Sequence, residues 1–224
     1  MRIDRAGFPF ILGALFPAVA FTIAGQTALA TILFLLGLGF ILFFRDPERR
    51  VLARGNEVVS PADGRILVAE HHKGSYAPSG EWLQVSVFLS PLDVHINRAP
   101  VSGRVIGVEH QAGRFFSAYR KDAAALNART EIWIDHKGQA IVCRQIVGFL
   151  ARRIVCRIKS GDDLCTGDRI GLMKFGSRMD VFLPVTADLQ VKVGQLVRGG
   201  ETVIATLAST TRVAVDAKGQ EEGG

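Results

Sequence analysis

The sequence predicts a mainly β protein, with a barrel-sandwich-like β domain that follows an N-terminal transmembrane helical hairpin. Two observations lead to this expectation. Residues 6–44 contain no Asp, Glu, Lys or Arg, whereas beyond residue 50 short runs rich in Val and Ile alternate with glycine-bearing turns. We therefore expect a membrane anchor over residues 1–50, a β-rich domain over residues 51–212 and a disordered tail over residues 213–224.

The expected anchor consists of two apolar segments, residues 7–23 and 27–44, on either side of a short Gly25-Gln26 break. Each is near the lower limit of the ~17–25 residues that cross a bilayer as a helix. Pro9 and Pro17 predict a kinked first helix, so a single or re-entrant span stays open beside the full hairpin.

Positive charge flanks both ends of the apolar region, which predicts its orientation. Arg2 and Arg5 precede it, and Arg45, Arg49 and Arg50 follow it. Because positively charged flanks stay on the cytoplasmic side, we expect both ends there. The β domain would then lie at the cytoplasmic face of the cell membrane.

The net charge indicates which partners to expect, and the cysteine content indicates whether to expect disulfides or a metal site. The formal net charge is +6, which favours attraction to an anionic lipid surface. Basic residues do not interleave with aromatic ones, so no nucleic acid partner is expected. Cys143, Cys156 and Cys165 are odd in number and lack C-x-x-C spacing, so we expect neither disulfides nor a metal site.

The β domain is expected to contain ten strands and one short helix. Alternating apolar residues and intervening turns predict strands at residues 65–69, 83–89, 103–108, 130–135, 140–147, 153–158, 169–175, 179–184, 189–193 and 201–205. A helix is expected near residues 118–126, and residues 191–200 resemble the turn of a biotinyl/lipoyl barrel-sandwich module. That likeness indicates a fold rather than an activity.

Four stretches contain residues suited to chemistry. Asp63 lies in the Ser-Pro-Ala-Asp-Gly turn of residues 60–64, and His95 lies among polar residues at 88–100. The Gly176-Ser177 pair separates two strand-like runs, and the stretch 127–130 offers polar groups. An Asp-Gly is usually only a turn, and a lone His is often structural. A His can also carry protons near neutral pH, and a glycine permits a strained bond before a nucleophilic serine.

Taken together and in this order, these stretches resemble the phosphatidylserine decarboxylases of the short bacterial and archaeal type. The resemblance extends from the apolar start through Phe44-Arg45-Asp46-Pro47-Glu48-Arg49 to the Phe-Gly-Ser-Arg segment that ends at Arg178. It implies a carboxy-lyase of phospholipid biosynthesis that converts phosphatidylserine to phosphatidylethanolamine and CO2. The family makes its pyruvoyl cofactor by cutting its own chain, which here implies a zymogen that gives β and α chains separated between residues 176 and 177.

The resemblance also implies a role for each site residue. Ser177 would be the self-cleavage nucleophile that becomes the pyruvoyl group, Gly176 would supply the attacked carbonyl, and His95, oriented by Asp63, would move the protons. Candidates for holding the substrate headgroup and phosphate are Arg98, Asn127, Arg129 and Arg178. Two features depart from the longer family members: Phe-Gly-Ser-Arg replaces Leu-Gly-Ser-Thr at the cut, and Arg98 takes the place of a second histidine.

Two other functions stay open from the residues alone. A membrane-tethered carrier would need a modified lysine at a hairpin tip, for which Lys174 is the candidate. A serine hydrolase would use Ser177, His95 and Asp63 as a triad. Whether the lipid chains are ester- or ether-linked, and whether the protein forms a homo-oligomer, is likewise left open.

Overall fold

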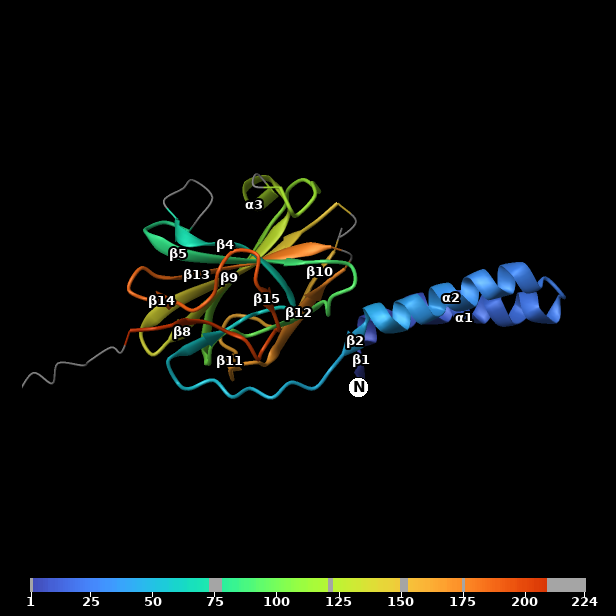
Figure 1. Ribbon diagram of the computed structural model, residues 1–224, viewed down its shortest axis with the longest axis horizontal. Coiled ribbons are helices and arrows are strands. Elements are labelled where there is room, and N and C mark those ends of the chain that lie inside the picture. The colour runs from blue at the N-terminus through green and yellow to red at the C-terminus, as the bar shows by residue number, and fades with distance from the viewer. Residues whose placement is uncertain (1, 73–77, 121–122, 150–152, 175, 209–224) are drawn as a thin grey trace, which may run out of the picture.

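A computed structural model describes residues 2–72, 78–120, 123–149, 153–174 and 176–208. Figure 1 shows two parts: a β domain and a pair of helices that project from one end of it. The expected tail at residues 213–224 lies outside the described residues.

The projecting part is a hairpin of two apolar helices, as the sequence predicts. A short 3-10 turn, η1 (Arg5–Gly7), leads into α1 (Phe8–Ile23), and α2 (Thr27–Phe43) returns beside it (Figure 1). Gly25 makes the turn with a φ of 77°. Pro9 lies in the first helical turn, where its missing N–H needs no partner, and the helix continues through Pro17. The stretch from Arg5 to Ile23 is long and apolar enough to cross a membrane.

The β domain is built on a curled eight-stranded antiparallel sheet (Figure 1). Its strands, from one edge to the other, are β11 (Asp163–Leu164), β7 (Gly103–Gln111), β8 (Arg129–His136), β9 (Gln139–Val147), β13 (Ser177–Pro184), β5 (Trp82–Leu89), β4 (Gly64–His72) and β15 (Leu196–Val197). Strand β13 therefore lies inside the sheet, hydrogen-bonded to β9 on one side and to β5 on the other.

Two three-stranded sheets and one strand pair complete the fold. One sheet contains β10 (Ile154–Cys156), β12 (Arg169–Met173) and β6 (Ile96–Arg98). The other contains β14 (Asp188–Leu189), β16 (Val203–Thr206) and β3 (Glu57–Val59). The strand pair is β1 (Arg2–Ile3) with β2 (Arg45–Asp46). Because β12 and β13 belong to different sheets, the chain crosses from one sheet to another between residues 173 and 177. The β1–β2 pair closes the base of the hairpin.

Most of the expected strands are confirmed, and several expected elements are shorter than predicted, among them the strand expected at residues 153–158, which spans Ile154–Cys156. The strand expected at residues 189–193 is reduced to Asp188–Leu189, because the chain turns at residues 193–194. The helix expected at 118–126 spans only Ala123–Leu126. The short strands β3, β6, β11 and β15 have too few residues for a period-two pattern and were not predicted.

Alternation along β13 decides which side chains enter the core. Met179, Val181 and Leu183 belong to the main apolar cluster, whereas Arg178 and Asp180 pair with each other on the opposite face. By the same alternation, Ser177 lies on the face of Met179 and Val181. A serine thus begins the strand at a position whose neighbours are apolar.

Ion pairs attach the base of the hairpin to the β domain. The Asp46 carboxylate of β2 accepts hydrogen bonds from Arg98 of β6 (3.1 Å) and Arg169 of β12 (2.5 Å). Asp4, just before α1, pairs with Arg157 at 2.6 Å. These contacts fix the hairpin base against the small sheet that contains β6.

Replacing Asp46 should destabilise the fold, because Arg98 is only 6 % exposed and would lose its carboxylate. Removing one partner of a buried pair costs about 3–5 kcal/mol. We expect Asp46→Ala to lower the free energy of unfolding by that order, as measured by denaturant titration in detergent. Glu48→Ala is the control, since its pair with Arg2 is exposed and 3.8 Å long, and such pairs contribute about 0–1 kcal/mol. Equal stability of the two variants would contradict this role of Asp46.

Candidate active site

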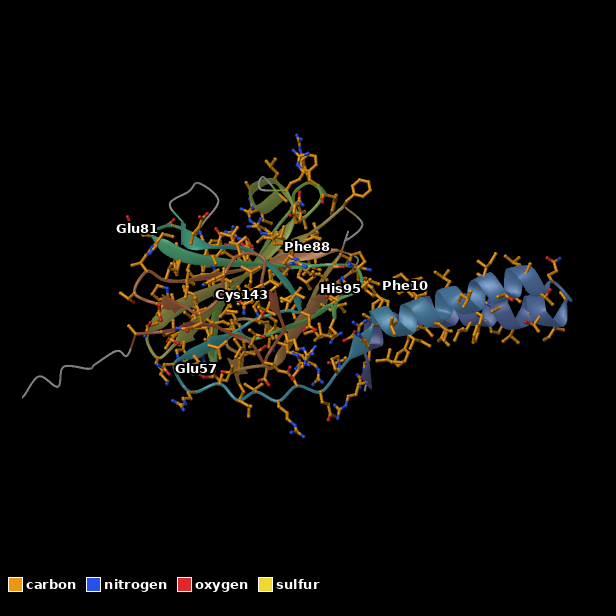
Figure 2. The ribbon with its side chains drawn as sticks, viewed as in Figure 1. Phe10, Glu57, Glu81, Phe88, His95 and Cys143 are labelled. Atoms are coloured by element: carbon orange, nitrogen blue, oxygen red, sulfur yellow. The ribbon has the colours of Figure 1, made fainter. Side chains whose placement is uncertain are left out.

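His95 is buried where the β domain meets the hairpin. It follows the turn of residues 90–94 and directly precedes β6, with 1 % of its surface exposed. Its ring centroid lies 4.1 Å from that of Phe43, the last residue of α2. Figure 2 shows His95 on the side of the domain that faces the helices, near Phe10 of α1. The hairpin base is therefore one wall of the histidine's pocket.

The hydrogen bonds of His95 determine which ring nitrogen carries the proton. Nδ1 lies 2.9 Å from the carbonyl oxygen of Asp93. Since a carbonyl only accepts, Nδ1 is the protonated nitrogen and Nε2 has the free lone pair. That lone pair faces the backbone N–H of Gly176 at 3.4 Å. A neutral imidazole thus presents its basic nitrogen to the residue that precedes Ser177.

Burial keeps this imidazole neutral at physiological pH. The pKa of His95 is lowered to about 4, chiefly by burial and to a smaller extent by the nearby charge of Arg45. The Asp93 carbonyl acts in the opposite direction, because it stabilises the protonated ring. His95 can therefore accept a proton at neutral pH, but it releases that proton readily.

Ser177 has a buried hydroxyl without a hydrogen-bond partner among the described residues. Leaving such a group unpaired costs about 1–3 kcal/mol, so its presence calls for an explanation. Gly176, just before it, has a φ of +72°, a left-handed conformation that glycine adopts without strain. The chain therefore makes an unusual bend at the bond where an unbonded hydroxyl begins β13.

Gly148 lies directly against the carbonyl of Gly176. A Cβ built on Gly148 would lie 2.2 Å from the Gly176 carbonyl oxygen and 3.1 Å from its carbon. No side chain fits in that space unless the carbonyl moves. The position of the Gly176 carbonyl thus depends on a glycine from the end of β9, which sequence reasoning did not identify.

Asp63 does not orient His95 through a hydrogen bond, so this expected contact is corrected. Its carboxylate accepts from Arg49 at 2.6 Å and from the backbone N–H of Gly199 at 2.8 Å. The Asp93 carbonyl takes the orienting position on His95 instead. Asp63 joins the turn of residues 60–64 to the turn of residues 199–200, and any part it has in proton transfer stays a prediction.

The four residues expected to hold the substrate all have partners within the protein. Arg98 bonds Asp46 and the carbonyls of Pro47 and Gly167, and Asn127 bonds the backbone of Phe116 and Val147. Arg129 pairs with Glu131 and Arg178 with Asp180. These contacts give each side chain a structural role, and their binding of substrate stays a prediction.

A family model of known proteins matches the part of the chain that contains this candidate site. The family model described as "Phosphatidylserine decarboxylase" matches residues 36–205 of the chain, a region that contains His95, Gly176 and Ser177. The chain belongs to the phosphatidylserine decarboxylase family.

Individual relatives extend the match over almost the whole chain. A phosphatidylserine decarboxylase proenzyme of Desulfotalea psychrophila is 39 % identical over 207 residues, which cover 92 % of this chain and 96 % of that one. The proteins of the same name from Cupriavidus pinatubonensis and Nocardia farcinica are 40 % and 44 % identical, and each match covers 92 % of this chain. The match covers 95 % and 88 % of those relatives.

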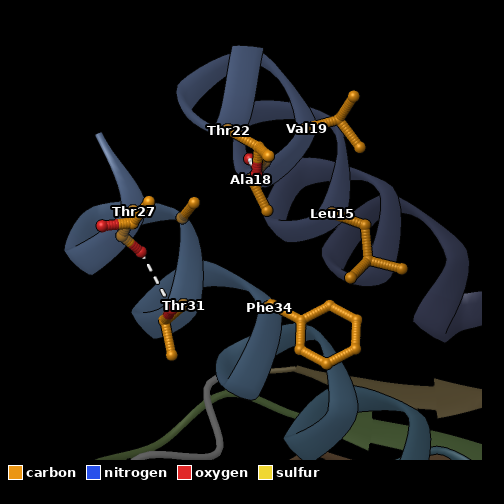
Figure 3. Close-up of a pocket in the computed structure, with 8 residues that line it drawn as sticks. Leu15, Ala18, Val19, Thr22, Thr27, Thr31 and Phe34 are labelled. Atoms are coloured by element: carbon orange, nitrogen blue, oxygen red, sulfur yellow. Dashed lines mark hydrogen bonds between the residues drawn. The ribbon is translucent and has the colours of Figure 1, made fainter. Parts of the chain in front are cut away.

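One cavity belongs to the hairpin rather than to the candidate active site. About 450 Å³ of space lies between α1 and α2, lined by Leu15, Ala18, Val19, Thr22, Thr27, Ala30, Thr31 and Phe34 (Figure 3). Two of its threonines, Thr22 and Thr31, donate their hydroxyls to carbonyls of their own helices, at 2.9 and 2.8 Å. With no titratable side chain in its lining, this cavity offers no proton-transfer group.

The geometry also bears on the carrier and hydrolase alternatives. Lys174 is not at a hairpin tip, because β12 and β13 lie in different sheets, and its ammonium lies 4.6 Å from the Phe10 ring centroid. The Ser177 hydroxyl is fully buried in the uncut chain, and the hydrolase alternative would require it to react with an acyl substrate from outside. Within the described residues, no group of three or more His, Cys, Asp or Glu could hold a metal. Cys143, Cys156 and Cys165 are free thiols.

Gly148→Ala should slow the expected cut between residues 176 and 177, because the added methyl displaces the Gly176 carbonyl. Gly171→Ala is a matched control: its Cβ would lie 2.1 Å from the carbonyl oxygen of Val155, away from the cut. We expect both variants to lose comparable thermal stability, and only Gly148→Ala to accumulate the uncut chain in a time course on denaturing gels. Equal cutting rates in the two variants would show that the Gly148 contact has no special role.

Proposed function

We propose that this chain cuts itself between Gly176 and Ser177, and that the product decarboxylates phosphatidylserine to phosphatidylethanolamine at a membrane. The observation that carries the proposal is the buried, unbonded Ser177 hydroxyl. It follows a left-handed glycine whose N–H faces the lone pair of a neutral His95. The names of the relatives supply the substrate, and the word proenzyme agrees with processing.

The first step of maturation uses the hydroxyl and the histidine. Ser177 Oγ attacks the Gly176 carbonyl carbon, and Nε2 of His95 takes the hydroxyl proton. Because its pKa is near 4, the imidazolium passes this proton on to the Ser177 nitrogen as the C–N bond breaks. The acyl group thus moves from nitrogen to oxygen, and an ester replaces the peptide bond.

The second step releases the β chain. Loss of the Ser177 α-proton and cleavage of the ester C–O bond give the Gly176 carboxylate and a dehydroalanine. Water then hydrolyses the dehydroalanine to a pyruvoyl group, with release of ammonia. The buried site fits this group, since the conversion removes the hydroxyl that has no partner in the uncut chain. At this position a pyruvoyl group would supply a carbonyl for the substrate amine and an electron sink for the loss of CO2.

In turnover, the protein supplies burial and a proton. The apolar pocket formed with Phe43 excludes water from around His95. After CO2 leaves, Nε2 of His95 would deliver a proton to the substrate carbon. The Asp93 carbonyl holds the ring in the orientation that this transfer needs.

The membrane position follows from the hairpin and its flanking charges. Large apolar side chains on both helices face outward, among them Phe16 and Ile23, which are 79 % and 83 % exposed. A lipid environment would cover them. With arginines before α1 and after α2, the hairpin would cross and return, leaving the β domain at the cytoplasmic face.

Ser177→Ala should leave a single uncut chain without decarboxylase activity, because the attacking oxygen is gone. Denaturing mass spectrometry of the unmutated protein should give two pieces, the smaller roughly 17 Da lighter than its encoded mass through loss of water and exchange of NH for O. Ser160→Ala, on an exposed turn, should be cut normally. A cut and active Ser177→Ala would overturn the proposal.

The cutting rate should stay constant from pH 8 to about pH 5 and fall only as the pH approaches 4. Burial lowers the pKa of His95 below its usual 6.5, so the basic form persists through mild acid. Phe43→Ala would admit water, raise this pKa and move the decline of the rate towards pH 6.5. Rates of purified precursor across this range provide the measurement. A decline centred near pH 6.5 in the unmutated protein would contradict the buried, neutral histidine.

A further inference from the structure

A second cavity lies at the base of α2, beside the candidate active site. It has a volume of about 260 Å³ and is lined by Leu36, Gly39, Phe40, Leu42, Phe43, Arg45, Pro91 and Leu92. Seven of these residues are apolar and one is a cation. Leu36, Leu42 and Leu92 are also well exposed to the surroundings, so the cavity opens where a bilayer would cover the hairpin base.

The charge of Arg45 is fixed in place but not neutralised by an ion pair. Its guanidinium donates to the carbonyls of Leu42 and Leu92, each at 2.7 Å. A guanidinium has five N–H donors, so others stay available in a rigid orientation. Within the described residues Arg45 forms no ion pair with a carboxylate, unlike Arg98, Arg129 and Arg178.

The cavity and the histidine pocket share one wall. Phe43 lines the cavity and packs its ring 4.1 Å from that of His95. The charge of Arg45 also reaches His95, where it contributes to the lowered pKa. A ligand held at Arg45 is therefore next to the group expected to deliver the proton.

The apolar side of the cavity follows one face of α2. Leu36, Gly39, Phe40 and Phe43 are spaced by three and four residues, so they form a stripe along the helix. Gly39 leaves an opening in that stripe, since a Cβ built there meets no atom within 4 Å. The stripe runs from the charged end of the cavity into the apolar hairpin.

From this arrangement we infer that the cavity binds the phospholipid substrate, with the phosphodiester on Arg45 and one acyl chain along the α2 stripe. Charge complementarity selects this occupant, because one fixed cation at the end of an apolar groove matches an anionic phosphate at the end of a hydrocarbon chain. The inference rests on the proposed function and adds a phosphate-binding residue to it.

The test of the charged end is a kinetic comparison of Arg45→Gln with unmutated protein. Loss of a charge-assisted contact to phosphate should raise KM by about tenfold or more with little change in kcat. The KM of Arg45→Lys should lie between the values of Arg45→Gln and the unmutated protein. Arg104 belongs to an exposed ion pair on β7, so the KM of Arg104→Gln should equal that of the unmutated protein. Mass spectrometry first establishes that each variant is cut, so that defects of maturation are separated from defects of binding.

The physical form of the substrate distinguishes phosphate recognition from attraction to a membrane. Dihexanoyl phosphatidylserine below its micellar concentration removes the bilayer. The inference predicts a raised KM for Arg45→Gln on this soluble substrate as well as on vesicles. An effect seen only on anionic vesicles would mean that Arg45 attracts the surface, which would overturn the inference while leaving the proposed function intact.

The apolar end has a test of its own that does not depend on Arg45. Gly39→Leu fills the groove, whereas Gly13→Leu adds the same side chain on α1, where a Cβ also meets no atom within 4 Å. We expect Gly39→Leu to raise KM for long-chain phosphatidylserine severalfold, and Gly13→Leu to leave it unchanged. Equal KM values in the two variants would exclude the groove as the acyl-chain site.

Discussion

The contact between Phe43 and His95 is the interaction on which the candidate site depends. It removes the imidazole from water, and that burial keeps the ring neutral and its Nε2 available as a base. Phe43 belongs to the apolar cluster at the hairpin base, together with Phe44, Val94, Ile96 and Leu172. The hairpin base therefore forms part of the surroundings of His95 in the candidate site.

The sheet topology explains how the Gly176-Ser177 bond comes to lie beside this histidine. Strand β12 pairs with β6, which begins next to His95, while β13 is held between β5 and β9. The chain between β12 and β13 must leave one sheet and enter the other within a few residues. Gly176 makes that change with a positive φ, and Gly148 leaves room for its carbonyl. The backbone geometry at the Gly176-Ser177 bond is thus set by the pairing of two sheets, one of which includes Ser177 itself.

The sequence predicts the long elements better than it predicts the contacts around the Gly176-Ser177 bond. Long strands and apolar helices have a repeating pattern, and the Gly176-Ser177 pair lies in a motif. By contrast, Asp46 and Arg98 are 52 residues apart and Arg49 and Asp63 are 14 apart. No local pattern states which carboxylate neutralises which arginine. The sequence alone therefore offers Arg98 and Arg178 as phosphate-binding candidates, although the fold uses both side chains in internal contacts. It offers Arg45 as a charge that flanks the hairpin and as part of the motif of residues 44–49.

The contacts of Arg98 also affect whether His95 alone could serve both the proposed maturation and the turnover. It occupies the position of a second histidine in longer family members, but its guanidinium is committed to Asp46, Pro47 and Gly167. An arginine at neutral pH has no lone pair with which to accept a proton. Under the proposed mechanism, proton transfer in both maturation and turnover then falls to His95. A lowered pKa suits both tasks, because a base that does not retain its proton returns to the neutral form after each transfer.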